Sequence, residues 1–219
     1  MAADEPAVAK IFGIGFGRTG TRSLARYLQS ASYNTIHWPS IVDGVNYETR
    51  IAAFIGDGAR VVEELMPVLD RYDAFTDVPF PGLYRELADL YPDARFILTT
   101  RNLENWWRSV ARHWGLAWGP YQLEPYLQIQ YRRYLPGKTV ARLADKALFI
   151  EAHEQHIQTA KADLAGRSLL CLDLDDPRLN ANIAAFLGVS SIGFPHVRES
   201  FVPRALLSKT RMLWRKNFG

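Results

Sequence analysis

A glycine-rich segment near the start of the chain combines hydroxyl and guanidinium side chains in a pattern suited to holding an anion. It covers residues 15–23 and reads GFGRTGTRS. Its glycines allow a tight turn whose backbone N–H groups converge on one point, and a helix that starts there adds about half a positive charge. The side chains that can donate to the same point are Arg18, Thr19, Thr21, Arg22 and Ser23. We interpret the segment as an anion-binding loop; a structural turn with surface arginines is the alternative.

This loop matches two common nucleotide-binding motifs only in part. A triphosphatase loop needs a Lys and then a Ser or Thr after its last glycine, to bind the terminal phosphates and magnesium. Here Thr21 and Arg22 hold those positions, which argues against magnesium-triphosphate chemistry. Gly15, Gly17 and Gly20 match the dinucleotide motif G-x-G-x-x-G, but the acidic residue expected about 20 residues later is missing. An NAD(P)-dependent oxidoreductase of the Rossmann type therefore stays open as an alternative.

A second candidate anion site follows an apolar run at residues 95–100. Arg101 would end this strand, and Asn102 would cap a helix that reaches about residue 114. Asn102, Asn105 and Ser109 then share one helix face, which looks toward Arg101. A guanidinium fork beside a hydroxyl makes a phosphate clamp. The structural alternative is an arginine in a surface ion pair and a buried helical serine.

The elements that must position these residues follow from alternating patterns along the chain. Short apolar runs that end at turn residues alternate with longer helical patterns, which predicts an α/β fold. Strands are expected at residues 10–15, 73–79, 95–100 and 168–173, and helices at residues 24–31, 82–91 and 102–114. Residues 120–164 are helix-prone and would form a helical layer or a lid. We expect a three-layer parallel sheet with helices on both faces and ligands at the carboxyl ends of its strands.

The loop and the helix after it resemble the 5′-phosphosulfate loop of the P-loop sulfotransferases, in particular the branch whose loop reads G-x-G-R-T-G-T-x-S-L. That family transfers a sulfuryl group from 3′-phosphoadenosine 5′-phosphosulfate (PAPS) to a hydroxyl or amine and releases 3′-phosphoadenosine 5′-phosphate (PAP). The resemblance implies a P-loop NTPase-like sulfotransferase fold and a set of residues around the phosphosulfate: Gly17, Arg18, Thr19, Gly20, Thr21, Arg22 and Ser23. Arg101 and Ser109, eight positions apart like the family's pair, would grip the 3′-phosphate. A nucleotide-binding partner protein without catalysis is a further alternative.

The same resemblance suggests a candidate base, and the sequence differs from the usual family pattern at two positions. In cytosolic members a catalytic His lies two residues before a Pro, and Asp77 holds that place before Pro79; other branches use a carboxylate. Asp77 is therefore the candidate base, and capping of the following turn is its structural alternative. Arg18 stands where most members carry a Lys, and it would stabilise the charge of the leaving phosphate without donating a proton. Ser23 replaces a Trp that stacks on adenine, so adenine recognition is left unassigned.

Composition predicts an ordinary globular protein. The chain has 219 residues, of which 48% are hydrophobic and 22% charged, which predicts a single domain over residues 1–219 with tails at about 1–9 and 198–219. Six Lys or Arg against one Glu lie from residue 198 onward, so the net charge of +3 is concentrated there. We therefore expect no nucleic acid partner. The resemblance to sulfotransferases implies a small-molecule acceptor. The basic tail could touch an acidic partner or a membrane surface; a solvated terminal helix is the alternative.

Compartment and metal content are also predicted from composition. A lone cysteine, Cys171, allows no internal disulfide and no cysteine-rich metal site. His153 and His156 lie three apart but lack further ligands at metal-binding spacing, so no metal is expected. No window approaches the ~18 apolar residues of a membrane span, and the first residues lack the pattern of a secretory signal. We expect a cytoplasmic protein.

Overall fold

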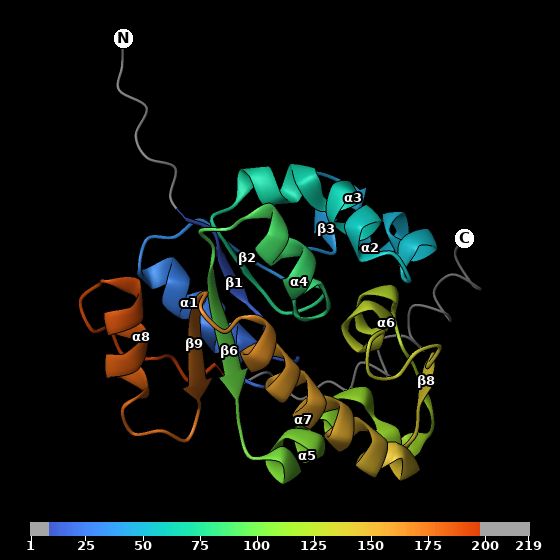
Figure 1. The fold of residues 1–219 in the computed structure, drawn as a ribbon. Coiled ribbons are helices and arrows are strands. Elements are labelled where there is room, and N and C mark those ends of the chain that lie inside the picture. Colours follow the sequence, from blue (N-terminus) through green and yellow to red (C-terminus); the bar gives the residue numbers. More distant parts are fainter. Residues whose placement is uncertain (1–8, 198–219) are drawn as a thin grey trace.

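A computed structural model describes residues 9–197 of the chain, and its centre is a parallel β-sheet (Figure 1). The five strands are β1 (Ile11–Gly13), β2 (Thr35–His37), β5 (Ala74–Thr76), β6 (Arg95–Thr100) and β9 (Ser168–Asp173). They pair in the order β2-β5-β1-β6-β9, and each neighbouring pair is parallel. The predicted α/β fold is thus confirmed. The edge strand β2 was not among the predicted strands.

Helices cover both faces of the sheet because successive side chains of a strand point to opposite faces. Ile11 and Ile97 belong to one buried cluster, and Phe12 and Phe96 belong to the other. The first cluster is covered by α1 (Thr21–Ser30) and α8 (Leu179–Leu187). The second is covered by α3 (Gly58–Arg71), α4 (Phe80–Leu90), α5 (Leu103–Trp114), α6 (Pro125–Tyr131) and α7 (Lys146–Asp163). Figure 1 shows the resulting three layers.

Shorter elements complete the described chain. They are the helical turns α2 (Tyr47–Arg50), η1 (Ala52–Phe54), η2 (Leu116–Trp118) and η3 (Leu143–Asp145), with two antiparallel pairs, β3 (Ile41–Val42) with β4 (Val45–Asn46) and β7 (Tyr121–Gln122) with β8 (Val140–Ala141). The region predicted as a helical layer or lid, residues 120–164, contains α6, α7 and the β7–β8 pair. Its two helices contribute buried side chains to the core, so it forms a layer.

Two helix starts position the candidate site. Gly20 precedes α1 in the left-handed conformation, with φ of 85°, and neither a capping side chain nor an acidic residue occupies the first turn. Asn102 caps α5 as predicted, because its side-chain oxygen accepts a hydrogen bond from the Asn105 N–H at 3.1 Å. Gly115, with φ of 68°, ends that helix. The first turn of α1 therefore carries N–H groups that no side chain caps.

None of the helices within residues 9–197 is both long and apolar enough to cross a membrane. The basic tail predicted from residue 198 lies outside the described residues, as does nearly all of the predicted N-terminal tail.

Candidate active site

A cavity of about 790 Å³ lies at the carboxyl ends of β1, β5 and β6. That volume is within the usual range for small-molecule sites, ~300–1,000 Å³. Its wall contains the loop after β1, Asp77 after β5, Arg101 after β6 and Ser109 on α5. Every residue that the sequence predicts for the site lines this cavity except Thr19. Residues far apart in the sequence are thus brought to one place by the parallel sheet.

The loop after β1 is held close to β6. A Cβ atom on Gly15 would lie 2.0 Å from Thr99 Oγ1 and 2.5 Å from the Thr99 carbonyl oxygen, so no larger residue fits there. Thr19 is fully buried; its hydroxyl donates to the Phe16 carbonyl at 2.7 Å and lies 2.7 Å from Thr99 Oγ1. The sequence predicts a ligand-facing hydroxyl at Thr19, whereas the structure turns this side chain into the core. Thr19 therefore braces the loop.

The start of α1 forms the floor of the cavity. Thr21, Arg22 and Ser23 line it, and their N–H groups belong to the first turn of a helix without a side-chain cap. A helix N-terminus attracts anions through the N–H groups of its first turn and through its dipole. Ser23 Oγ also accepts a hydrogen bond from the Val197 N–H at 3.3 Å, which brings the last described segment to the cavity rim.

Two arginines add fixed positive charge, and they are linked to each other. Arg18 has a left-handed backbone, with φ of 74°, and its Nε donates to Ser109 Oγ at 3.1 Å. Arg101 Nη1 donates to the Arg18 carbonyl at 3.2 Å. Burial lowers the pKa of the Arg101 guanidinium; Asp175 opposes this effect and the charge of Arg18 adds to it. Crowded cations of this kind are stabilised by an anionic ligand.

Asp77 faces the loop from the end of β5. Its Oδ1 accepts a hydrogen bond from the Val78 N–H at 3.0 Å, and its Oδ2 lies 3.3 Å from His37 Nε2. A Cβ atom on Gly17 would lie 3.3 Å from Asp77 Oδ1, so the carboxylate is next to the loop backbone. The side chain of Asp77 is 21% exposed. Asp77 therefore makes the local turn contact of the structural alternative and also opens into the cavity.

Sequence reasoning did not identify two polar residues of the site. His37 ends β2 and contacts Asp77, and Gln130 Oε1 accepts a long hydrogen bond, 3.4 Å, from the Gly17 N–H. The rule that ligands collect at the carboxyl ends of parallel strands would have pointed to His37 once β2 was recognised. No local pattern marks Gln130, because its place depends on how α6 packs against the loop.

The rest of the wall is largely apolar. The apolar residues of the wall include Trp38, Val78, Val110, Trp114, Leu127 and Tyr131. Three of them, Trp114, Leu127 and Tyr131, come from α5 and α6. These apolar side chains can surround the apolar body of an acceptor whose reacting group lies beside the Asp77 carboxylate.

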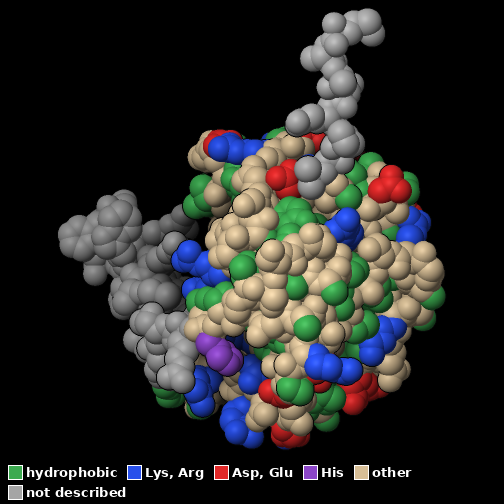
Figure 2. All heavy atoms as spheres, turned by 90° about the vertical axis from the view of Figure 1, so that its left-hand side faces the viewer, with side chains coloured by type: hydrophobic (Ala, Val, Ile, Leu, Met, Phe, Trp, Pro, Cys, Tyr) green, Lys and Arg blue, Asp and Glu red, His purple; other side chains and the backbone are tan. Residues whose placement is uncertain are grey.

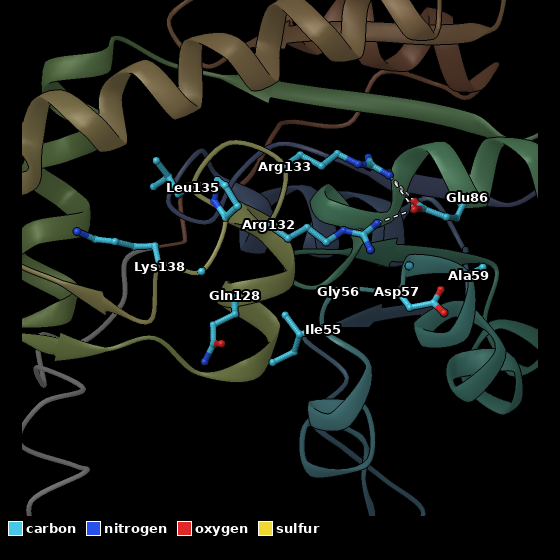
Figure 3. Close-up of a pocket in the computed structure, with 13 residues that line it drawn as sticks. Ile55, Gly56, Asp57, Ala59, Glu86, Gln128, Arg132, Arg133, Leu135 and Lys138 are labelled. Atoms are coloured by element: carbon cyan, nitrogen blue, oxygen red, sulfur yellow. Dashed lines mark hydrogen bonds and ion pairs between the residues drawn. The ribbon is translucent and has the colours of Figure 1, made fainter.

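A second cavity, of about 910 Å³, lies between α3, α4 and α6 and has a different character (Figure 3). Arg132 and Arg133 reach toward Glu86 there, with N–O distances of 2.6 and 2.7 Å. Burial alone would raise the pKa of Glu86, but the two guanidinium groups help to hold it below its usual value. Lys138 pairs with Asp145 at 2.9 Å. The charges of this cavity are thus largely compensated by protein groups, and no predicted site residue lines it.

Basic side chains are scattered over the outside of the α1 and α8 layer. Figure 2 shows Lys and Arg on that face, several of them beside the His drawn in purple, with Asp and Glu mainly toward its upper and lower margins. The visible described surface of this face therefore has mixed charge. The two linked arginines and the α1 N-terminus concentrate positive charge inside the 790 Å³ cavity.

Histidines and tryptophans near the loop belong to the core. His153 and His156 are fully buried, and His156 Nε2 lies 2.7 Å from the Ile14 carbonyl oxygen. Trp106 is buried too, and its indole N–H donates to the Gly17 carbonyl at 3.0 Å. A search of residues 9–197 gives no group of three or more His, Cys, Asp or Glu side chains placed to hold a metal ion.

These features define an α/β protein whose parallel sheet carries, at the carboxyl ends of its strands, a cavity lined by two arginines and a helix N-terminus. Numbering the five strands in chain order, the sheet runs 2-3-1-4-5, which differs from the dinucleotide-binding order in which strand 2 lies beside strand 1. The family described as "Sulfotransferase domain" matches residues 10–201, and the chain belongs to this family. Family membership supports a sulfotransferase activity.

A solved structure has a similar fold. The crystal structure of a sulfotransferase from Alicyclobacillus acidocaldarius is similar, with a TM-score of 0.53 and 18% sequence identity. The match covers 96% of this chain and 93% of that one. Among curated proteins, none matches this sequence.

Proposed function

We propose that the protein transfers a sulfuryl group from PAPS to a hydroxyl or amine of a small-molecule acceptor and releases PAP. One observation carries the proposal: a single cavity joins the start of α1, which has no side-chain cap, the guanidinium groups of Arg18 and Arg101, and the carboxylate of Asp77. An anionic donor and a proton acceptor are the two requirements of sulfuryl transfer to a hydroxyl. This combination is what the family assignment leads one to expect.

The donor would lie with its two charged ends on different elements. The phosphosulfate would contact the loop at residues 17–23, with Arg18 beside it. The 3′-phosphate would contact Arg101 and Ser109. The Ser109 hydroxyl accepts from Arg18 Nε, and its own proton is left for a phosphate oxygen. The role of Arg101 is supported by its partial burial, because a desolvated guanidinium gains most from an anionic partner.

The chemical step would be an in-line displacement at sulfur. The acceptor oxygen or nitrogen forms a bond to sulfur while the bond between sulfur and the bridging oxygen of the phosphosulfate breaks. The electron pair of that broken bond leaves with PAP, and the acceptor proton passes to Asp77. Arg18 stabilises the negative charge that develops on the leaving phosphate, and because it stays protonated it supplies charge only.

The function is tested by binding and transfer measured on the same protein. Titration calorimetry should give tight binding of PAP and none of NADPH. Radiolabelled PAPS, offered with a panel of phenols, alcohols and amines, should then yield labelled product and PAP. NADPH binding without PAP binding would favour the oxidoreductase, and PAP binding without transfer to any acceptor would favour a non-catalytic nucleotide-binding protein.

The role of Asp77 is tested by Asp77→Asn, which keeps shape and removes the proton acceptor. We expect kcat to fall by ~10²–10⁴-fold, the usual contribution of a general base. PAP affinity should stay within about 2-fold, because the base contacts the acceptor and not the nucleotide. The matched control is Asp89→Asn, the same change at an exposed position of α4, which should leave both quantities unaltered. An unchanged kcat in Asp77→Asn would remove Asp77 from the mechanism.

A further inference from the structure

His37 is placed between two groups of the neighbouring strand β5. The strands are parallel and His37 pairs with Thr76 in their register. His37 Nδ1 lies 2.9 Å from Thr76 Oγ1, and His37 Nε2 lies 3.3 Å from Asp77 Oδ2. The imidazole therefore bridges the last residue of β5 and the carboxylate that follows it.

The partners of the ring favour one position for its proton. An ionised carboxylate only accepts hydrogen bonds, so a proton on His37 Nε2 makes the 3.3 Å contact with Asp77 Oδ2 favourable, whereas a lone pair there would oppose it. The Thr76 hydroxyl can donate to Nδ1 of a neutral ring or accept from a charged one. In both cases Nε2 carries a proton, and Nε2 is the ring nitrogen that lies beside Asp77. The contact is therefore compatible with both the neutral and the charged imidazole.

The same geometry argues against His37 as the base. A histidine base needs one nitrogen directed at the acceptor, as in the serine protease triad, while the other is oriented by a carboxylate. Here the second nitrogen faces Thr76, whose residue is fully buried, and not the open part of the cavity. The two side chains are about equally exposed, at 18% for His37 and 21% for Asp77, but Asp77 lies directly beside the loop.

Both oxygens of Asp77 are consequently restrained. Oδ1 accepts from the Val78 N–H, and Oδ2 is opposite His37 Nε2. Two contacts on different oxygens define the plane of the carboxylate, which one contact alone would leave free to rotate. Each oxygen has a second lone pair, so the carboxylate keeps the capacity to take a proton.

We propose that His37 is a positioning residue for Asp77, held by Thr76 so that its Nε2–H group fixes the carboxylate in the direction of the acceptor. This inference rests on the proposed function, because it presumes that Asp77 receives the acceptor proton. It assigns a role to β2, the edge strand, whose carboxyl end would otherwise only border the cavity.

A double-mutant cycle between His37 and Asp77 tests the proposal on the full chain. His37→Phe should lower kcat by about 10- to 100-fold, as expected for a misplaced catalytic group. KM for PAPS and the Kd of PAP should change by less than about 2-fold. His37→Gln, whose amide can donate from about the same place as Nε2, should recover most of the loss. In the Asp77→Asn background, His37→Phe should have little further effect.

Other results would overturn it. An equal loss from His37→Phe with and without Asp77 would mean that the two residues act independently. A Kd for PAP that weakens in step with kcat would mean that the substitution only disturbs the cavity. The control on the same strand is Thr35→Val, which removes a hydroxyl bonded to the Tyr33 carbonyl and does not touch Asp77; it should leave kcat unchanged.

A spectroscopic measurement separates this inference from the proposed function. Nitrogen NMR of the imidazole rings in the intact protein should report a proton on His37 Nε2, and Asp77→Asn should shift that resonance. A neutral ring protonated only at Nδ1, or no response to Asp77→Asn, would overturn the positioning role even if sulfuryl transfer is found. Absence of sulfuryl transfer beside the expected NMR response would instead overturn the proposed function, and with it the catalytic purpose of the pair.

Discussion

Arg18 links the candidate binding groups before any ligand is present. Its side chain donates to Ser109 and its carbonyl accepts from Arg101, so one residue ties the loop after β1 to both members of the predicted phosphate clamp. Side chains that are already ordered lose less conformational freedom when a ligand binds. The side chains predicted to form the clamp are therefore already held in place by these hydrogen bonds, and the contribution of each can be measured separately.

For the single residue Arg101, we expect substitution by Ala to weaken the binding of PAP much more than the binding of adenosine 5′-phosphate. Loss of hydrogen bonds to a charged group costs ~1.5–3 kcal/mol, so PAP affinity should fall about 10- to 100-fold. Affinity for adenosine 5′-phosphate, which lacks the 3′-phosphate, should fall much less. Calorimetric titration of both nucleotides gives the comparison, with Arg112→Ala as the control because Arg112 is exposed on α5. Equal losses for the two nucleotides would exclude the 3′-phosphate assignment.

Individual residues were predictable where chain spacing determines geometry. Arg101 and Ser109 lie at a strand end and on the following helix, so their separation in sequence nearly fixes their separation in space. The direction of the Thr19 hydroxyl was not predictable, because it depends on Thr99 of another strand. His37 and Gln130 reach the site through sheet pairing and helix packing, which leave no local pattern.

Close packing between the loop and β6 positions the element that carries the binding groups. Gly15 lies so near Thr99 that an added methyl group would meet its backbone oxygen at 2.5 Å. This oxygen belongs to a central strand and cannot move independently, so any larger residue must push the loop away from β6. The loop geometry thus depends on this one contact between elements.

We expect Gly15→Ala to lower the free energy of unfolding by ~1–3 kcal/mol, the usual cost of overpacking a core. Urea denaturation followed by circular dichroism measures the change. Gly56→Ala is the matched control, since no atom lies within 4 Å of its added Cβ, and its unfolding free energy should stay within ~0.5 kcal/mol of the parent. Similar losses in both variants would show that lost glycine flexibility, and not the Thr99 contact, is responsible.

The elements that were predicted best are the two six-residue strands. Residues 95–100 and 168–173 form β6 and β9 with the predicted bounds, because each is a short run rich in apolar residues and bounded by turns. β2 has three residues, all partly exposed, and gives too weak a signal. α3 contains Pro67, starts at Gly58 and lies just after Gly56, features that usually mark a helix boundary, so its pattern was missed.

Two buried histidines make the stability of the whole molecule sensitive to acid. Burial lowers the pKa of His153 to about 3 and that of His156 to about 4; for His156 the contact with Ile14 opposes the effect. Both values lie below the ~6.5 of an unfolded histidine. Between these values the unfolded chain binds more protons than the folded one, so the stability is complete above pH ~6.5 and is lost as the pH falls toward 4.

We therefore expect the free energy of unfolding to fall between pH 6.5 and 4, with a slope of up to ~1.4 kcal/mol per pH unit for each histidine. His153→Phe should flatten the slope and preserve stability at neutral pH, because both ring nitrogens are buried without a hydrogen-bond partner and the ring stacks on Phe16. His156→Phe should also flatten it but destabilise the protein at pH 7, since the Ile14 carbonyl and Tyr134 hydroxyl lose a partner. Denaturant titrations at several pH values test both; an unaltered slope in both variants would contradict the assignment.

The strand order affects how the protein folds. β5 lies between β2 and β1, so the ends near residues 17, 37, 77 and 101 become neighbours only after long stretches of intervening chain have been closed into the sheet. Contacts of such large sequence separation form late and slowly during folding. Incomplete or cleaved pieces of this chain would consequently not form the cavity even in part. The cavity would form together with the sheet in one cooperative step.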